Sequence, residues 1–149
     1  MDQNQAIDTL EHLIERCRDG HNGFKEAATK IKQTDLKTWF DEVSLERGRF
    51  AEELQNELVR LGKPDKRVKG TTEAALHRAW LDAKSALGGG DHMILEWLEH
   101  GEDFAKDAYQ KALTSDLPEN IAIIVRRQAG SVQQVHDRVK LLRDAAKAA

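Results

Sequence analysis

The sequence predicts an all-α protein that folds as a four-helix bundle, and three observations support this fold class. Apolar residues recur at steps of three and four along four long stretches, as they do in helices that bury one face. These stretches are rich in Ala, Leu, Glu, Lys and Arg, which favour helices. Both prolines and the run Gly88-Gly89-Gly90 lie at the boundaries of these stretches, and no alternating pattern predicts a strand.

The 149 residues are predicted to form one domain, 1–149. Five helices are expected, at about residues 3–32, 35–61, 72–87, 92–114 and 117–147. Their first turns carry residues of the capping type, namely Thr34 or Asp35, Thr72, Asp91, and Asp116 with Glu119. Gly62 and Pro64 end the second helix. The short helix has one apolar side, formed by Ala75, Leu76, Ala79, Trp80 and Ala83, and His77 and Trp80 are expected to dock it on the bundle.

The lengths of the connections predict how these helices are arranged. The first two long helices and the last two are joined by only a few residues, so each pair forms an antiparallel hairpin. Roughly 30 residues, including the short helix, separate the two hairpins, and they are long enough to return along a bundle of about 40 Å. The prediction is therefore a ferritin-like four-helix bundle with one long crossover, containing a short helix, between helices 2 and 3.

Polar residues interrupt each long apolar stripe near its middle, where a bundle is driest: His21, Glu46, Glu102 and His136. With the crossover, all four lie about 16–18 Å from the same end of the bundle, in one layer. An inward carboxylate costs several kcal/mol unless it is paired, protonated or bound to a metal. Carboxylates and imidazoles that converge from facing helices are how helical bundles bind pairs of iron or manganese ions.

Short motifs along nearly the whole chain occur in an order and at a spacing typical of a known group. They are Gly20 with Phe24-x-x-Ala27-Ala28, Glu46-Arg47, Leu61-Gly62, His77-x-x-Trp80, Gly101-Glu102-Asp103 and His136-Asp137. Through them the chain resembles a bacterial family of ferritin-like four-helix-bundle proteins of unknown function, and it is distantly similar to rubrerythrin-type domains. This resemblance implies the fold and a cytoplasmic setting, and it implies no activity.

The resemblance also identifies candidate metal ligands. Di-metal bundles usually take a Glu from each of two helices and a Glu-x-x-His from each of the other two. On that pattern Glu46 and Glu102 occupy carboxylate positions, and His136 occupies a histidine position. These three residues are the candidate ligands.

The same pattern has gaps in this sequence. Arg49 stands where the second histidine belongs, Gln133 stands where a glutamate belongs, and the first helix offers His21, Cys17 or Gly20 in place of a glutamate. A guanidinium repels metal ions and pairs well with carboxylates. We therefore expect a degenerate site, closed by ion pairs or hydrogen bonds of Arg49, Gln133 and His21. No cofactor is expected, and iron or manganese is the alternative.

Charge and composition exclude several classes of protein. With 23 Lys+Arg against 26 Asp+Glu the net charge is −3, so the chain has no basic surface for nucleic acid. The single Cys17 excludes an internal disulfide. No uncharged run approaches the roughly 20 residues that span a bilayer, and the polar N-terminus is no signal peptide. We expect a cytoplasmic protein that binds neither nucleic acid nor membrane.

Three functions are compatible with these features. The leading hypothesis is a non-catalytic binding or structural module, with a degenerate di-metal site, no catalytic residue and an unknown protein partner. The first alternative is a divergent di-iron or di-manganese oxidoreductase or metal-binding protein, which requires compensating ligands such as His21, Glu99 or Asp103. The second alternative is a helical self-assembly module that forms a homodimer.

Overall fold

The computed structural model describes residues 2–63, 67–86, 88 and 90–148. These residues form five helices and no strand: α1 (Gln3–Lys30), α2 (Thr34–Arg60), α3 (Thr72–Ala86), α4 (Gly90–Leu113) and α5 (Glu119–Ala148). The predicted all-α class is confirmed. The expected break at Pro64, the expected end of the short helix at residue 87, Gly89 and the two terminal positions lie outside the described residues. None of the described helices is long and apolar enough to cross a bilayer.

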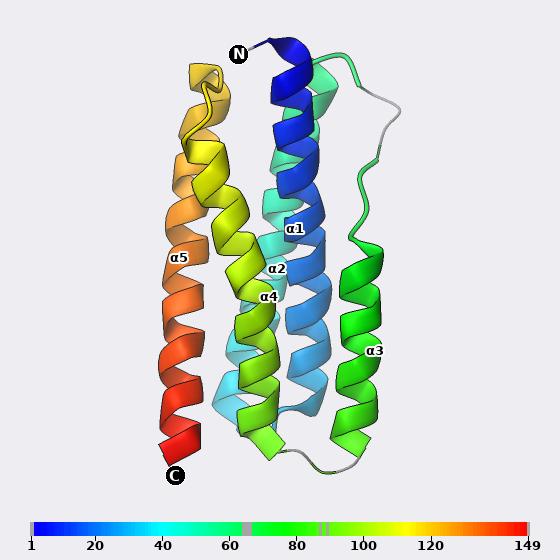
Figure 1. The fold of residues 1–149 in the computed structure, drawn as a ribbon, viewed down its shortest axis with the longest axis vertical. Helices are drawn as coiled ribbons and strands as arrows, with labels where there is room; N and C mark the ends of the chain where they lie inside the picture. Colours follow the sequence, from blue (N-terminus) through cyan, green and yellow to red (C-terminus); the bar gives the residue numbers. More distant parts are fainter. Residues whose placement is uncertain (1, 64–66, 87, 89, 149) are drawn as a thin grey trace.

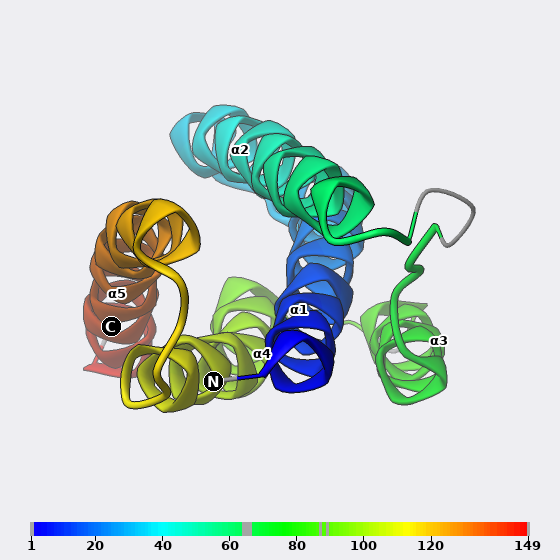
Figure 2. The ribbon, with the colours of Figure 1, turned by 90° about the horizontal axis from the view of Figure 1, so that it is seen from above.

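The long helices lie along one axis, with α1 and α5 running in one direction and α2 and α4 in the other, and α3 lies in the crossover (Figure 1). Helices α1 and α2 form one hairpin and α4 and α5 the other, and α3 leads the chain back so that α4 begins where α1 meets α2. Viewed from above, α1 lies between α2, α3 and α4, and α3 lies outside the bundle on the side away from α5 (Figure 2). Helices α2 and α5 have few contacts, so α1 and α4 form the centre of the molecule.

At the starts of two helices, α2 and α5, the groups that form the hydrogen bonds are not the side chains predicted as caps. Asp91, expected to cap α4, instead accepts hydrogen bonds from the backbone N–H groups of Lys32 (2.9 Å) and Gln33 (3.4 Å), the two residues that precede α2. Helix α2 has no side-chain cap of its own, so a carboxylate on another helix stabilises its positive end. Helix α5 begins at Glu119 rather than 117, and the Pro118 carbonyl accepts a hydrogen bond of its first turn at 2.9 Å.

Two apolar clusters fill the bundle. One, on the side of the α4–α5 turn, includes Leu10, Leu13, Leu54, Leu58, Tyr109 and Val125, with Val68 of the crossover. The other, on the side of the α1–α2 turn, includes Phe24, Ile31, Phe40, Ile94, Trp97 and Val139, with Leu81 of α3. These residues belong to the stripes predicted for the long helices, except Val68 and Leu81. Polar side chains lie between the two clusters. Buried polar groups are nearly always hydrogen-bonded, so these side chains are expected to bind one another.

The apolar side predicted for the short helix faces outward, so that part of the prediction is wrong. All of its members are exposed: Ala75, Leu76, Ala79, Trp80 and Ala83. Leu81, on another side of α3, is instead fully buried in the core. The alanines offer little apolar area, so the burial of Leu81 and a few polar contacts decide the rotation of α3.

Three polar contacts hold α3 against the bundle. Thr71 precedes the helix and donates its backbone N–H and its hydroxyl to the Asp19 carboxylate of α1, at 2.7 and 3.0 Å. The same hydroxyl accepts a hydrogen bond from a backbone N–H of the first turn, so Thr71 rather than Thr72 caps α3. Trp97 of α4 donates its indole N–H to the His77 carbonyl at 2.9 Å. At the far end, Lys30 of α1 forms an ion pair of 2.8 Å with Asp82.

Candidate functional site

A buried arginine–glutamate pair lies in the polar layer. Arg47 of α2 donates from both terminal nitrogens to the two carboxylate oxygens of Glu102 of α4, at 2.7 and 2.6 Å. The two side chains are 1% and 2% exposed. Burial lowers the pKa of Arg47, but the Glu102 carboxylate outweighs this effect and leaves that pKa raised, so the guanidinium stays charged. Each charge therefore depends on the other inside the bundle.

A glycine on α1 provides the space for this arginine. A Cβ atom at Gly20 would lie 2.9 Å from Nη1 of Arg47, closer than ordinary van der Waals contact. One turn further along α1, the ring of Phe24 lies 5.6 Å from the guanidinium carbon. Beside the Arg47 guanidinium, helix α1 thus contributes the backbone of Gly20 and the ring of Phe24, and neither group binds metal ions.

A second buried polar chain crosses the bundle from α1 through α4 and α5 to α2. The Cys17 sulfur lies 3.0 Å from the Tyr109 hydroxyl, which donates to the side-chain oxygen of Gln128 at 2.7 Å. Gln128 in turn donates to Glu53 at 2.8 Å. Burial raises the pKa of the Cys17 thiol to about 11 and also raises the pKa of Tyr109. Cys17 is therefore a protonated, unreactive thiol at neutral pH.

Arg49 does not take the part predicted for it. It is exposed, whereas Arg47 makes the ion pair with Glu102, so the expected pairing through Arg49 is wrong. Residues two apart on a helix differ by about 200° in direction, so these two arginines cannot both face the core. Arg47 is the residue that sequence reasoning missed. The apolar stripe of α2 allowed either position 46 or position 47 to face inward, and the structure buries Arg47 and leaves Glu46 half-buried.

Two further predicted residues lie at the edge of α1 and α2. Glu46 accepts a hydrogen bond from the Ser131 hydroxyl of α5. Nδ1 of His21 lies 2.8 Å from the Ser44 carbonyl of α2. Both Glu46 and His21 line an open, largely charged hollow that Arg49 also lines. Neither residue is brought to Glu102, so the structure does not assemble the predicted ligand set around one point.

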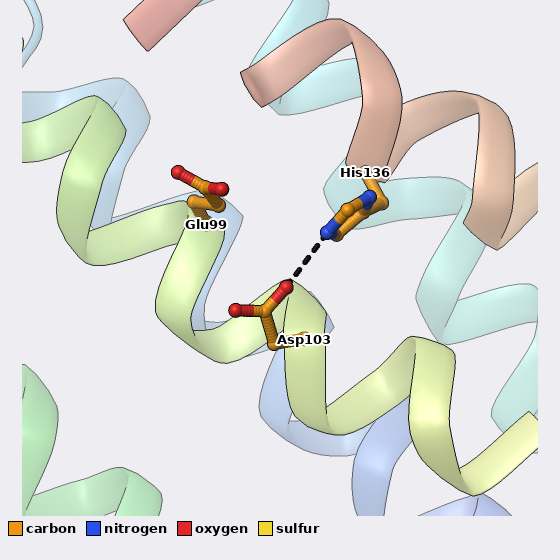
Figure 3. Close-up of side chains that lie close together, drawn as sticks. All are labelled: Glu99, Asp103 and His136. Atoms are coloured by element: carbon orange, nitrogen blue, oxygen red, sulfur yellow. Dashed lines mark hydrogen bonds and ion pairs between the residues drawn. The ribbon is translucent and has the colours of Figure 1, made fainter.

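His136 of α5, the third predicted ligand, faces Glu99 and Asp103 of α4 (Figure 3). Its Nε2 lies 2.7 Å from Asp103, and its Nδ1 lies 3.1 Å from Asp137. Gln133 points to the same surface and donates to Asp137 at 2.9 Å. One ligand atom from each of Glu99, Asp103 and His136 lies within 4.8 Å of the others. This group, here called the α4–α5 triad, joins one nitrogen donor to two carboxylates.

The α4–α5 triad already has protein partners. Glu99 is buried and forms an ion pair with Arg143 of α5, while the Asp103 side chain is 50% exposed. A histidine that binds Zn²⁺ through one nitrogen commonly hydrogen-bonds a carboxylate through the other, and Asp137 is placed for that role. The donor set therefore fits a single divalent ion better than it fits a pair of ions.

The centre of the bundle does not fit a ferritin-type metal pair. Two divalent ions need about four carboxylates to balance their charge. Around Arg47 the described residues offer one hydrogen-bonded carboxylate, that of Glu102, which Arg47 already neutralises, and the backbone of Gly20. The guanidinium would repel both ions. The interior residues are therefore incompatible with a di-metal centre in this state.

A cavity of about 390 Å³ lies between α1, α3 and α4. We call it the α3 cavity, since residues of α3 line one side of it. Its lining includes Gly20 and Phe24 of α1, Ala74 of α3, and Gly101 and Glu102 of α4. Glu102 thus faces the Arg47 guanidinium and also lines this cavity.

Residues 5–115, most of the chain, match the family model described as "Domain of unknown function (DUF2383)". The chain belongs to this family. Among solved structures it is similar to a mutant of Dps1 from Mycobacterium smegmatis, with a TM-score of 0.71 and 15% identity over 95% of this chain and 96% of that one. At this identity the likeness shows the fold alone, and it confirms the ferritin-like bundle. A search of curated proteins gave no match.

Proposed function

We propose that this member of the family is a non-catalytic binding module, in which the Arg47–Glu102 pair stands where related bundles hold metal ions. The observation that carries the proposal is the bidentate pair itself, whose two side chains are 1% and 2% exposed. A buried guanidinium supplies the positive charge that metal ions supply in a di-metal centre. We also propose, on the basis of the sequence motifs, that the chain is distantly related to rubrerythrin-type domains.

The proposal is tested by growing cells with added iron and manganese and measuring the metal content of the purified protein. We expect no stoichiometric iron or manganese in the wild-type protein or in Glu102→Gln, and no peroxide-dependent iron oxidation above the buffer rate. The His136→Gln variant separates the two locations, because it removes the α4–α5 triad and leaves the interior intact. Stoichiometric iron or manganese that persists in His136→Gln and disappears in Glu102→Gln would overturn the proposal.

Binding of one divalent ion at the α4–α5 triad is a second candidate function. It is supported by three ligand atoms of suitable type within 4.8 Å of one another. Two ligands of a tetrahedral Zn²⁺ ion lie roughly 3.3 Å apart, since each bond is about 2.0 Å long. The 2.7 Å contact between His136 and Asp103 is shorter, so the ion would displace the shared proton and push the two side chains slightly apart.

Calorimetric titration with Zn²⁺ at neutral pH tests this second function. We expect one ion per chain in the wild type, and an affinity at least about tenfold lower for Asp137→Asn, which leaves all three ligands but removes the carboxylate behind His136. His12→Gln is the matched control, because His12 is exposed on α1, where it lies 3.9 Å from Glu15, and it is not part of the triad. Equal Zn²⁺ affinities for His136→Gln, His12→Gln and the wild type would exclude the triad as a metal site.

The cytoplasmic setting, the unknown protein partner and the homodimer expected from the sequence stay predictions. A binding module is compatible with each of them, and none is needed for the metal experiments described above.

A further inference from the structure

We propose that the α3 cavity binds a neutral, planar heteroaromatic small molecule. The proposal rests on the proposed function and deepens it, because it names the class of ligand that the binding module takes. Five features of the cavity carry the proposal: the small residues that leave it open, the fixed position of α3, the aromatic wall, the balance of charge, and an unpaired hydrogen-bond donor.

Small residues on all three helices leave the cavity open. Gly20 of α1, Ala74 of α3, and Gly101 and Ala105 of α4 all line it. A Cβ atom added at Gly101 would meet no atom within 4 Å in the described part of the chain. Glycine is disfavoured inside a helix relative to alanine, and no close neighbour requires it at position 101. The glycine keeps this wall of the cavity free of side chain.

Helix α3 cannot close the cavity without breaking contacts. Its beginning is tied to α1 through Asp19 and Thr71, at 2.7 and 3.0 Å. Its middle is tied to α4 by the hydrogen bond from Trp97 to the His77 carbonyl, and Leu81 beyond it is fully buried in the core. The space near Ala74 lies between these anchors, so the structure maintains the cavity instead of filling it.

One wall of the cavity is a row of rings. The centroids of His77 and Trp97 lie 4.7 Å apart, those of His77 and His100 lie 5.3 Å apart, and those of His100 and Phe104 lie 5.2 Å apart. Rings at these separations offer faces and edges to a further flat ring. An engineered cavity of about 150 Å³ holds one benzene, so about 390 Å³ has room for a molecule of two fused rings.

The charges around the cavity compensate one another. Glu102 is neutralised by Arg47, and Arg16 lies 3.6 Å from Asp19. Burial and the neighbouring His100 lower the pKa of His77, which favours a neutral ring at pH 7. Glu73 and Arg78 also line the cavity and add one charge of each sign, so the lining carries no net charge once Arg47 neutralises Glu102. A charged ligand would lose its hydration without meeting a net opposite charge, whereas a neutral ligand has no such cost.

One hydrogen-bond donor of a residue that lines the cavity lacks a partner in the described part of the chain. Nε of Arg16 is buried and has no hydrogen-bond partner among the residues described. The guanidinium carbon of the same residue lies 5.0 Å from the centre of the Phe104 ring. A planar ligand that stacks on this wall and carries a carbonyl oxygen would satisfy Arg16 Nε. A ligand with only an N–H donor would not.

Coumarin is a suitable probe, because it is neutral, planar and bicyclic and carries a carbonyl acceptor. We would titrate it into the ¹⁵N-labelled full chain and follow the Gly101 amide and the Trp97 indole N–H by NMR. Both signals should shift and saturate together. Gly101→Leu should weaken binding at least about tenfold by filling the cavity. Gly130→Leu is the matched control, since its Cβ also meets nothing within 4 Å and Gly130 does not line the cavity.

Two further variants keep the test decisive. Ala74→Leu fills the cavity from α3 and should reproduce the loss if Gly101→Leu perturbs α4. Arg16→Met should weaken coumarin about tenfold and leave indole, which has only an N–H donor, within about twofold. Coumarin affinities within about twofold of wild type in both filling variants would overturn the proposal.

Two other results would also overturn it. One is the absence of saturable shifts up to the solubility limit of coumarin. The other is a set of shifts at the same signals that depends on protein concentration without coumarin, which would assign the cavity to a second copy of this chain. A stoichiometric interior metal would overturn the proposed function through the Glu102→Gln comparison, whether or not coumarin binds. The two failures are therefore distinguishable.

Discussion

The polar layer and the α3 cavity lie on two sides of Glu102, and each has a helical glycine beside it. At Gly20 a methyl group would collide with the Arg47 guanidinium at 2.9 Å, whereas at Gly101 it would meet nothing. Both Arg47 and Arg16 have a buried Nε without a partner among the described residues, but the terminal nitrogens of Arg47 hold Glu102 at 2.7 and 2.6 Å inside the bundle, whereas Arg16 lines the cavity. The difference teaches that the bundle centre is closed, while space for a ligand lies outside it, under α3.

Breaking the buried pair should have the largest effect on stability. Arg47→Ala leaves Glu102 charged and unpaired, so we expect the free energy of unfolding to fall by about 3–5 kcal/mol in urea denaturation. Arg49→Ala, on the exposed side of the same helix, should change it by less than about 0.5 kcal/mol. Replacing both partners, by Arg47→Met with Glu102→Leu, should recover most of the loss. Equal effects of the two alanine variants would contradict the account of the polar layer.

Gly20→Ala should show how tightly the polar layer is packed. The added methyl meets a guanidinium that two hydrogen bonds hold in place, so we expect a loss of about 1–3 kcal/mol in urea denaturation. Gly23→Ala is a close control on α1, since its Cβ would lie 3.5 Å from Trp97, an ordinary contact. If the loss at Gly20 persists unchanged in an Arg47→Met background, crowding by Arg47 is not its cause.

Alkaline pH should weaken the buried chain that begins at Cys17. Burial raises its pKa from 9.0 to about 11, so above pH 9 the unfolded chain releases a proton that the folded chain keeps. Stability contributed by the protonated thiol is therefore lost as pH rises, by about 1–1.5 kcal/mol at pH 10. Urea denaturation at pH 8, 9 and 10 measures this loss. The Cys17→Ala variant should lack this slope, and an equal slope in the variant would show that other groups cause it.

The smallest effect is expected at the cavity wall. Gly101→Ala adds a methyl where nothing lies within 4 Å and improves helix propensity, so stability should rise by about 0.5–1 kcal/mol. Thermal denaturation with Gly130→Ala as the comparison measures this gain. A loss at Gly101, with a gain at Gly130, would mean that the α3 cavity is narrower than described and would remove the contrast with Gly20.

Much of the fold follows from local patterns along the chain. The stripes of α1, α2, α4 and α5 repeat at helical spacing over many turns, and the unequal connections predict a single crossover. The rotation of α3 was not predictable in this way. Its alanines, Leu76 and Trp80 outnumber Leu81, yet the depth of burial of Leu81 and the contacts at Thr71 and His77 decide which side faces the bundle.

The site was predicted only in part, for a similar reason. Sequence reasoning found Glu102 and His136 as polar residues of the layer but gave them the wrong neighbours. Positions 46 and 47 both fit the stripe of α2, and a difference of about 100° around the helix decides which one is buried. The α3 cavity has no sequence motif, because it is the space left by small residues from three helices that are far apart in the chain.

The sequence by itself determined the helices, their order and the presence of polar groups at mid-height, because hydrophobic periodicity and chain length act locally. Only the tertiary structure decided that Arg47 closes the centre, that His136 joins Glu99 and Asp103, and that α3 leaves a cavity. These outcomes depend on which side chains meet across helices. If a helix turns about its axis by one residue, about 100°, different side chains face the neighbouring helices, while the helix propensity of the segment is unchanged.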